Sequence, residues 1–260
     1  GIVEEISTRA EKFGAVPVLV SYLCEAGCKP ARVERRHNDP DQKKRKYFER
    51  YDLGKIREIE AKEIPHWYPK DRMMHAPEDQ ECWGVKWRAG TSNFRRVDEL
   101  FTKRNLWALA AIRDRAKEFN RDIEDQLLFA FDACILGVSR MVRESNTATM
   151  SGTYYIPQIS KEVKVPSSFQ SKLEVAIKGW QEIGTNQTNV FISNESATQM
   201  NNAFANSIDY IFTDPPYAEK VQYGELNFVW EAWLDFDTHW HDEEIIVNEI
   251  RGKTEEDWAT

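Results

Sequence analysis

The feature that most constrains the fold is a short apolar run, residues 208–212, which ends abruptly at Thr213-Asp214-Pro215-Pro216-Tyr217. A run of this length rich in β-branched and aromatic residues is typical of a strand. The two prolines fix φ and remove two backbone donors, so the chain cannot continue a sheet ladder past them. The sequence therefore predicts a strand that ends at the rim of a sheet, where open α/β folds place their chemistry.

The flanking sequence predicts the neighbouring elements of such a sheet. Residues 188–192 form a second β-rich run, and a polar, asparagine-rich connection over 194–206 separates it from the first. After the prolines, residues 223–234 carry apolar side chains at helical spacing, from Leu226 to Trp233. Strand, loop, strand, motif and helix in this order are typical of a doubly wound sheet. We therefore expect an α/β fold.

The residue types at the prolines indicate recognition of an aromatic amine. Such an amine is a poor nucleophile because its lone pair is delocalised into the ring. Acceptance of its two N–H hydrogens by the Asp214 carboxylate and the Pro215 carbonyl would free the lone pair, and Tyr217 would stack on the extruded base. The alternative is purely structural, a rigid exit from a strand with a buried tyrosine.

The segment resembles the catalytic motif of amino-methylating DNA methyltransferases, whose pattern is Asp/Asn/Ser-Pro-Pro-aromatic. The chain as a whole is similar to the later part of large prokaryotic adenine-specific DNA methylases described as containing a zinc ribbon. Further matching stretches are residues 97–106, 152–157, 244–248 and 251–253, in the order of that family. The resemblance implies a Rossmann-like methyltransferase that uses S-adenosylmethionine to methylate the N6 amine of a flipped adenine in double-stranded DNA.

Two sets of site residues follow from this resemblance. The catalytic set is Asp214, Pro215, Pro216 and Tyr217. The cofactor-binding set, assigned by topological analogy, is Glu195, Ser196, Thr213 and Asp214. Tyr223 either lines the base pocket and contacts DNA or packs under the helix that follows it. Aspartate at the first motif position favours adenine N6 over cytosine N4 as the target, because the cytosine enzymes more often carry serine there.

A basic run near the N-terminus also indicates DNA as a partner. Residues 29–57 hold 11 lysines and arginines against five acids, although the chain has a net charge of −8 and residues 225–260 hold 11 acids and two bases. Phosphate binding responds to the local field rather than to the net charge. The residues expected to contact DNA are Arg35, Arg36, Lys43, Lys44, Arg45 and Lys46. The alternative is a solvated, charged face without a ligand.

We expect two parts in the chain. Residues 1–90 are strand- and loop-rich and resemble a degenerate zinc ribbon that serves target recognition. Residues 91–260 are expected to hold helices and the catalytic half of the methyltransferase domain. Apolar periodicity predicts helices over 97–119, 123–143 and 168–183, with Asn120 as a cap between the first two.

Metal and cofactor binding follow less directly from the sequence. Cys24 and Cys28 could share a metal ion, but a structural zinc site needs four ligands and no second cysteine pair is present, so we do not expect zinc. The chain also has no glycine-rich turn of the kind that lets a backbone approach S-adenosylmethionine. In the resembled family that turn lies upstream of the ribbon. We therefore expect the remainder of a longer methyltransferase polypeptide as a partner.

Three functions remain open at this point. The first is an adenine-N6 DNA methyltransferase, and the second is a DNA-binding or target-recognition module without catalysis of its own. The third is methylation of cytosine N4 or of a protein amide, since glutamine-modifying enzymes use a related Asn-Pro-Pro-Tyr motif. The absence of a long apolar run and of a signal-peptide pattern, together with scattered cysteines, predicts a cytoplasmic protein with no membrane partner.

Overall fold

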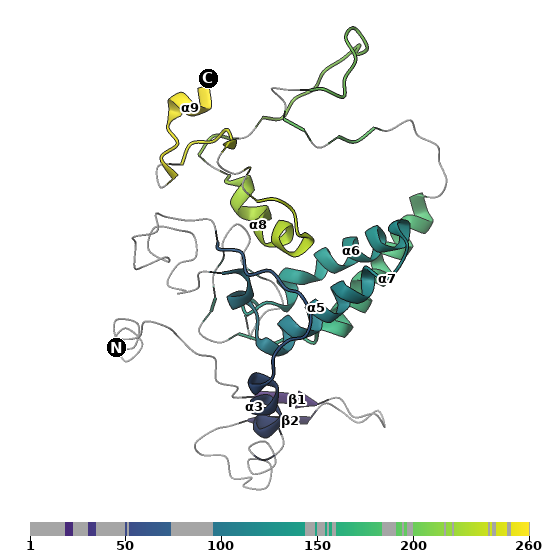
Figure 1. Ribbon diagram of the computed structural model, residues 1–260, viewed down its shortest axis with the longest axis vertical. Coiled ribbons are helices and arrows are strands. Elements are labelled where there is room, and N and C mark those ends of the chain that lie inside the picture. Colours follow the sequence, from purple (N-terminus) through teal and green to yellow (C-terminus); the bar gives the residue numbers. More distant parts are fainter. Residues whose placement is uncertain are drawn as a thin grey trace.

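The structure of the chain is a computed structural model, shown in Figure 1. It describes residues 19–22, 31–34, 50, 52–73, 96–143, 149, 154, 156–157, 160–183, 191–193, 195–196, 200–215, 217–219, 221–238, 240, 243–248 and 251–259. Most of the described residues in regular structure lie in helices, and strands form only at 19–22 and 31–34. The described part of the chain is therefore built mainly from helices.

The elements begin with a strand pair and continue as helices. In chain order they are β1 (Leu19–Tyr22), β2 (Ala31–Glu34), α3 (Leu53–Ala61), the 3-10 turn η2 (Val97–Leu100), α5 (Lys103–Ala116), α6 (Arg121–Ile135), the 3-10 turn η3 (Leu136–Val138), α7 (Val165–Ile183), α8 (Tyr223–Leu234) and α9 (Glu255–Ala259). β1 and β2 pair antiparallel, with Leu19 opposite Glu34 and Tyr22 opposite Ala31. Among the described residues this pair is the whole of the sheet structure.

The predicted α/β sheet is wrong. Residues 208–212, expected as the motif strand, are irregular, and Tyr210 and Phe212 are 81% and 82% exposed. Residues 191–193, at the end of the other expected strand, are irregular too, and 184–190 lie outside the described residues. A β-rich run becomes a strand only when a neighbouring segment supplies ladder partners and buries one face. The described residues supply no such neighbour to 208–212.

The helices follow the predicted pattern with shifted ends. The helix expected over 97–119 is divided into η2 and α5, because Thr102 is extended and caps α5 by accepting a hydrogen bond from the Asn105 amide at 3.3 Å. The predicted cap at Asn120 is confirmed, since its side chain accepts from the Ile123 amide at 3.1 Å. α6 ends at Ile135, earlier than expected. The helix predicted over 223–234 is confirmed as α8.

The hydrophobic core lies where η2, α5, α6 and α8 meet. Trp233 of α8 is fully buried, and Phe101 and Phe131 present their rings to it edge-on at centroid distances of 5.7 and 5.5 Å. Each large apolar side chain buried in this way contributes about 1.5–3 kcal/mol. α6 contacts α5, α7 and α8. The core therefore fixes α8, whose first residue follows the proline motif by only six positions.

The segment between α7 and α8 differs from this core. Figure 1 shows residues 200–215 as a looped trace that lies apart from the helices α5, α6 and α7. Residues 201–215 are all exposed, and no helix or strand forms among them. The proline motif thus lies between an exposed segment on one side and an anchored helix on the other.

Candidate functional site

The proline motif places a carboxylate and an aromatic ring side by side on the surface. Asp214 is exposed and Tyr217 is 55% exposed, and the Tyr217 hydroxyl donates a hydrogen bond to Asp214 Oδ1 at 3.3 Å. The charge of Asp214, and then this hydrogen bond, raise the pKa of Tyr217 above its usual value. Pro215 is exposed as well, whereas Pro216 lies outside the described residues. A long hydrogen bond at the surface is weak, so a ligand can replace it readily.

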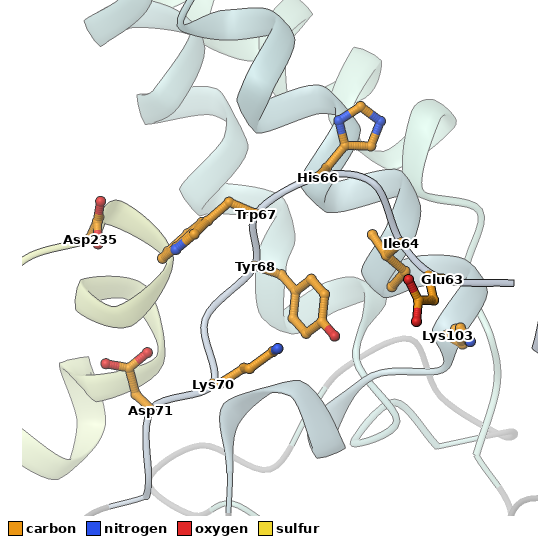
Figure 2. Close-up of a pocket in the computed structure, with 9 residues that line it drawn as sticks. All are labelled: Glu63, Ile64, His66, Trp67, Tyr68, Lys70, Asp71, Lys103 and Asp235. Carbon is orange, nitrogen blue, oxygen red and sulfur yellow. The ribbon is translucent and has the colours of Figure 1, made fainter.

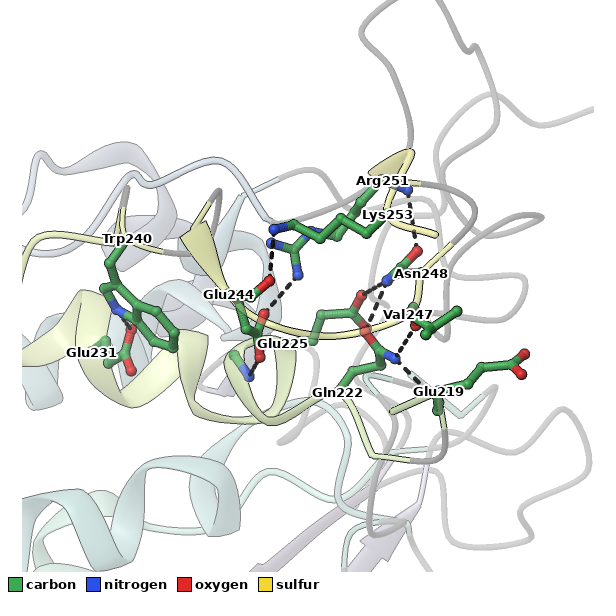
Figure 3. Close-up of polar contacts among 11 residues, drawn as sticks. Glu219, Gln222, Glu225, Glu231, Trp240, Glu244, Val247, Asn248, Arg251 and Lys253 are labelled. Atoms are coloured by element: carbon green, nitrogen blue, oxygen red, sulfur yellow. Dashed lines mark hydrogen bonds and ion pairs between the residues drawn. The ribbon is translucent and has the colours of Figure 1, made fainter. Parts of the chain in front are cut away.

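The N-terminus of α8, just after the motif, is held by a part-buried ion pair (Figure 3). Glu244 accepts a hydrogen bond from the Gly224 backbone amide at 2.9 Å, and it forms an ion pair with Arg251 at 2.8 Å. Both side chains of that pair are only 9% exposed. Lys253 Nζ donates to the Glu244 carbonyl at 2.6 Å. The first amides of a helix lack partners within the helix and favour negative charge, so Glu244 caps α8 from a separate segment.

Two side-chain amides connect the same helix to the turn after Tyr217. The Gln222 amide nitrogen donates to the Glu219 carbonyl at 3.1 Å and to the Val247 carbonyl at 3.0 Å. The Asn248 amide nitrogen donates to Gln222 Oε1 at 3.0 Å and to Glu225 Oε1 at 3.1 Å. Gln222 and Glu225 are each 5% exposed. These contacts, shown in Figure 3, join residues 219–225 to the segment around Asn248.

The residues predicted to bind the cofactor do not form a cradle. Thr213, Asp214, Glu195 and Ser196 are all exposed. The Glu195 carboxylate accepts hydrogen bonds from the Ser193 hydroxyl at 2.9 Å and, through its other oxygen, from the Asn201 amide at 3.0 Å. Both oxygens of Glu195 are therefore used within its own loop. This donor set does not fit S-adenosylmethionine, because it offers no enclosed surface for the ligand.

The predicted DNA contacts are only partly described. The residues Arg35, Arg36, Lys43, Lys44, Arg45 and Lys46 lie outside the described residues. Tyr223 is the first residue of α8 and is 41% exposed. Its ring is therefore accessible, six positions after Tyr217 in the chain. Its predicted role in the base pocket stays a prediction.

The structure also holds a cleft of about 820 Å³, whose lining residues are drawn in Figure 2. It is lined by the segment that follows α3, by Lys103 of α5 and by Asp235 at the end of α8. Trp67 lies in this lining, and its ring stacks on the buried Arg113 guanidinium at 3.8 Å. Arg113 also pairs with Asp235 at 3.6 Å. None of the predicted catalytic or cofactor residues belongs to this lining, so the two sites are separate.

The described part of the chain holds neither a candidate metal site nor a membrane-spanning helix. No group of three or more His, Cys, Asp or Glu side chains there could hold a metal ion. Cys24 and Cys28, the weak metal candidates, lie outside that part. None of the described helices combines the length and the apolar character needed to cross a membrane.

Comparison of the chain with protein-family profiles, with curated proteins and with solved structures finds no match. The similarity to adenine-specific DNA methylases therefore stays a prediction from the motifs.

Sequence reasoning missed the polar cluster behind the motif as part of the site. Residues 244–248 and 251–253 resemble stretches of the methylase family, but the sequence assigns them no role. A signal was present, however: Gln222 and Glu225 stand at the start of an otherwise strongly apolar helix, where polar side chains are expected to need buried partners. Their common partner, Asn248, lies 26 residues beyond Gln222 and 23 residues beyond Glu225 in the chain, and spacing alone does not identify it.

Proposed function

We propose that this protein takes part in methylation of the N6 amine of adenine in DNA, with S-adenosylmethionine as the methyl donor. The observation that carries the proposal is the exposed pair of Asp214 and Tyr217 on a loop whose far end is anchored to α8. A carboxylate beside an aromatic ring provides an acceptor for an exocyclic amine and a face on which its base can stack. The partner is DNA, and we place the protein in the cytoplasm.

The residues of the motif would act on the amine as follows. Asp214 accepts one N–H hydrogen of the amine, and the Pro215 carbonyl accepts the other. Tyr217 releases its hydrogen bond to Asp214 and stacks on the base. These contacts make the nitrogen lone pair available by position and electrostatics, without a covalent link to the protein. S-adenosylmethionine would supply the methyl group: the new N–C bond would form as the sulfonium S–C bond breaks, S-adenosylhomocysteine would leave, and the nitrogen would lose one proton.

The cofactor itself requires residues other than those described. The four predicted contacts are exposed and Glu195 is occupied within its loop, which supports a role for the described residues in recognition of the amine rather than of the cofactor. We propose that S-adenosylmethionine is held by parts of the enzyme outside the described residues. No step of the proposed chemistry therefore depends on Glu195 or Ser196.

The test is transfer of labelled methyl from S-adenosylmethionine to unmethylated DNA, measured with the parts of the enzyme that hold the cofactor present. The protein is compared with Asp214→Ala and with Asp209→Ala, which removes another exposed carboxylate from the same segment. We expect label in N6-methyladenine, a loss on the order of 100-fold in Asp214→Ala because one preorganised contact to the reacting group is removed, and full activity in Asp209→Ala. DNA affinity, measured in parallel, should be the same for all three proteins.

The possible failures of this test have different meanings. Full transfer by Asp214→Ala would exclude the motif as the catalytic loop. Label on cytosine or on protein would replace the proposed target by one of the alternative amines. DNA binding without any transfer would instead support a recognition module in which the motif is structural.

A further inference from the structure

The Gln222–Asn248 amide pair uses all of its hydrogen-bonding groups. Each amide has two N–H hydrogens and one oxygen. Gln222 gives its hydrogens to the Glu219 and Val247 carbonyls, and Asn248 gives its own to Gln222 and Glu225. The Asn248 oxygen accepts from the Arg251 amide at 3.2 Å. A buried polar network in which every member is satisfied favours one geometry strongly, because any displacement leaves a buried group unpaired.

This pair holds the chain directly after the motif. Ala218, the residue after Tyr217, has a φ of +47°, in the left-handed region that a non-glycine residue adopts only when its surroundings hold it there. The next carbonyl, that of Glu219, is one of the two that Gln222 binds. The turn at 218–219 is therefore connected through Gln222 to Asn248 and, through α8, to the core.

We infer that Gln222 and Asn248 are positioning residues, which fix the turn after Tyr217 and thereby the placement of the Asp214–Tyr217 pair relative to α8. The inference rests on the proposed function, because placement matters for rate only if Asp214 contacts the amine. Residues 201–215, which run into the motif, are exposed. Among the described residues, the contacts that restrain the motif therefore lie at its C-terminal end, at the turn that Gln222 binds. A misplacement of about 1 Å at a reacting group can lower a rate on the order of 100-fold.

Isosteric substitutions test this pair with little change of volume. Asn248→Asp places a carboxylate against Gln222 Oε1 and the Glu225 carboxylate, and Gln222→Glu places one against two carbonyls. The matched control is Asn227→Asp, the same chemical change at an exposed position of α8. Each protein carries 3-fluorotyrosine at position 217, and its 19F resonance reports the order of the turn independently of activity.

We expect the resonance to shift or broaden in Asn248→Asp and Gln222→Glu and to stay as in the unsubstituted protein in Asn227→Asp. The kcat for methyl transfer should fall roughly 10- to 100-fold in the first two, with the KM for DNA nearly unchanged, because binding is retained while placement is lost. Circular dichroism checks that each variant is folded. If the charged variants unfold, Asn248→Ser, which adds no charge, replaces them in both measurements.

The outcomes separate the inference from the proposed function. An unchanged resonance in both variants overturns the inference, and so does a raised KM with an unchanged kcat. A changed resonance together with the kcat loss supports it. If the resonance changes in the variants but the unsubstituted protein itself transfers no methyl group, the pair still fixes the turn. That result overturns the proposed function instead.

Discussion

Trp233 and Phe212 are both large aromatic residues in apolar stretches, yet the first is fully buried and the second is 82% exposed. Trp233 belongs to a helix, which satisfies its own backbone and needs only one apolar surface to cover its stripe. Phe212 belongs to a run suited to a strand, whose backbone and side chains both need neighbouring strands. The difference shows that local sequence is enough to form the helical centre of this chain but not to order the motif segment.

The largest expected effect comes from emptying the centre of the core. Trp233→Ala removes the ring that Phe101 and Phe131 contact edge-on, and we expect the free energy of unfolding to fall by about 3–5 kcal/mol, the range for deletion of a buried aromatic side chain. Urea unfolding followed by circular dichroism measures the change.

Trp233→Phe is the matched control. The indole nitrogen of Trp233 is buried without a hydrogen-bond partner among the described residues, so phenylalanine loses volume there but no hydrogen bond. We expect Trp233→Phe to be clearly more stable than Trp233→Ala. A cost below about 1 kcal/mol for Trp233→Ala, the average cost of any substitution, would show that α8 is not fixed by this core.

A smaller effect is expected from the acid at the contact of α6 and α8. The backbone carbonyl of Asp132 accepts a hydrogen bond from the Trp230 indole at 3.0 Å, while its side-chain Oδ1 is buried without a hydrogen-bond partner in the described structure. Burial raises the pKa of Asp132 to about 7 from an ordinary value of 3.8. Between these two values the folded protein binds a proton that the unfolded chain has released, so stability falls as the pH rises.

Asp132→Asn removes this titration and isolates its contribution. We expect the stability of the unsubstituted protein, relative to that of Asp132→Asn, to fall by about 2 kcal/mol between pH 5 and pH 7, since each unit of pKa shift corresponds to about 1.4 kcal/mol. The difference should then be constant above pH 8. Urea unfolding at several pH values measures it, and a difference that does not change with pH would mean that Asp132 is solvated.

The same contrast explains which features were predictable from the sequence. α8 was predicted from the spacing of residues such as Leu226 and Trp233, and the Asn120 cap from its residue type, because both depend on neighbours within one or two turns. The sheet was predicted from residues 188–192 and 208–212 on the assumption that other strands would lie beside them. That assumption concerned distant segments, which no local pattern contains.

Within the candidate site the limit is similar. The adjacent carboxylate and ring of Asp214 and Tyr217 were predicted, because the two residues are only three positions apart in the chain. The Gln222–Asn248 pair was not, because it depends on how the chain returns to α8 after 26 residues. The cofactor contacts were transferred by analogy from a sheet that the described residues do not form, and the structure places Glu195 in a loop of its own.

The smallest expected effect is the sharpest test of the contrast. Phe212→Ser removes a ring that is 82% exposed, so almost no buried apolar area is lost, and we expect the free energy of unfolding to change by less than about 0.5 kcal/mol. The measurement is urea unfolding beside Trp233→Ala under the same conditions. A loss above about 1 kcal/mol would mean that Phe212 is covered in solution, because only burial gives an aromatic side chain that much stabilisation. The motif segment would then be ordered by contacts of its own, and Asp214 would be positioned from both ends of its loop rather than from the α8 side.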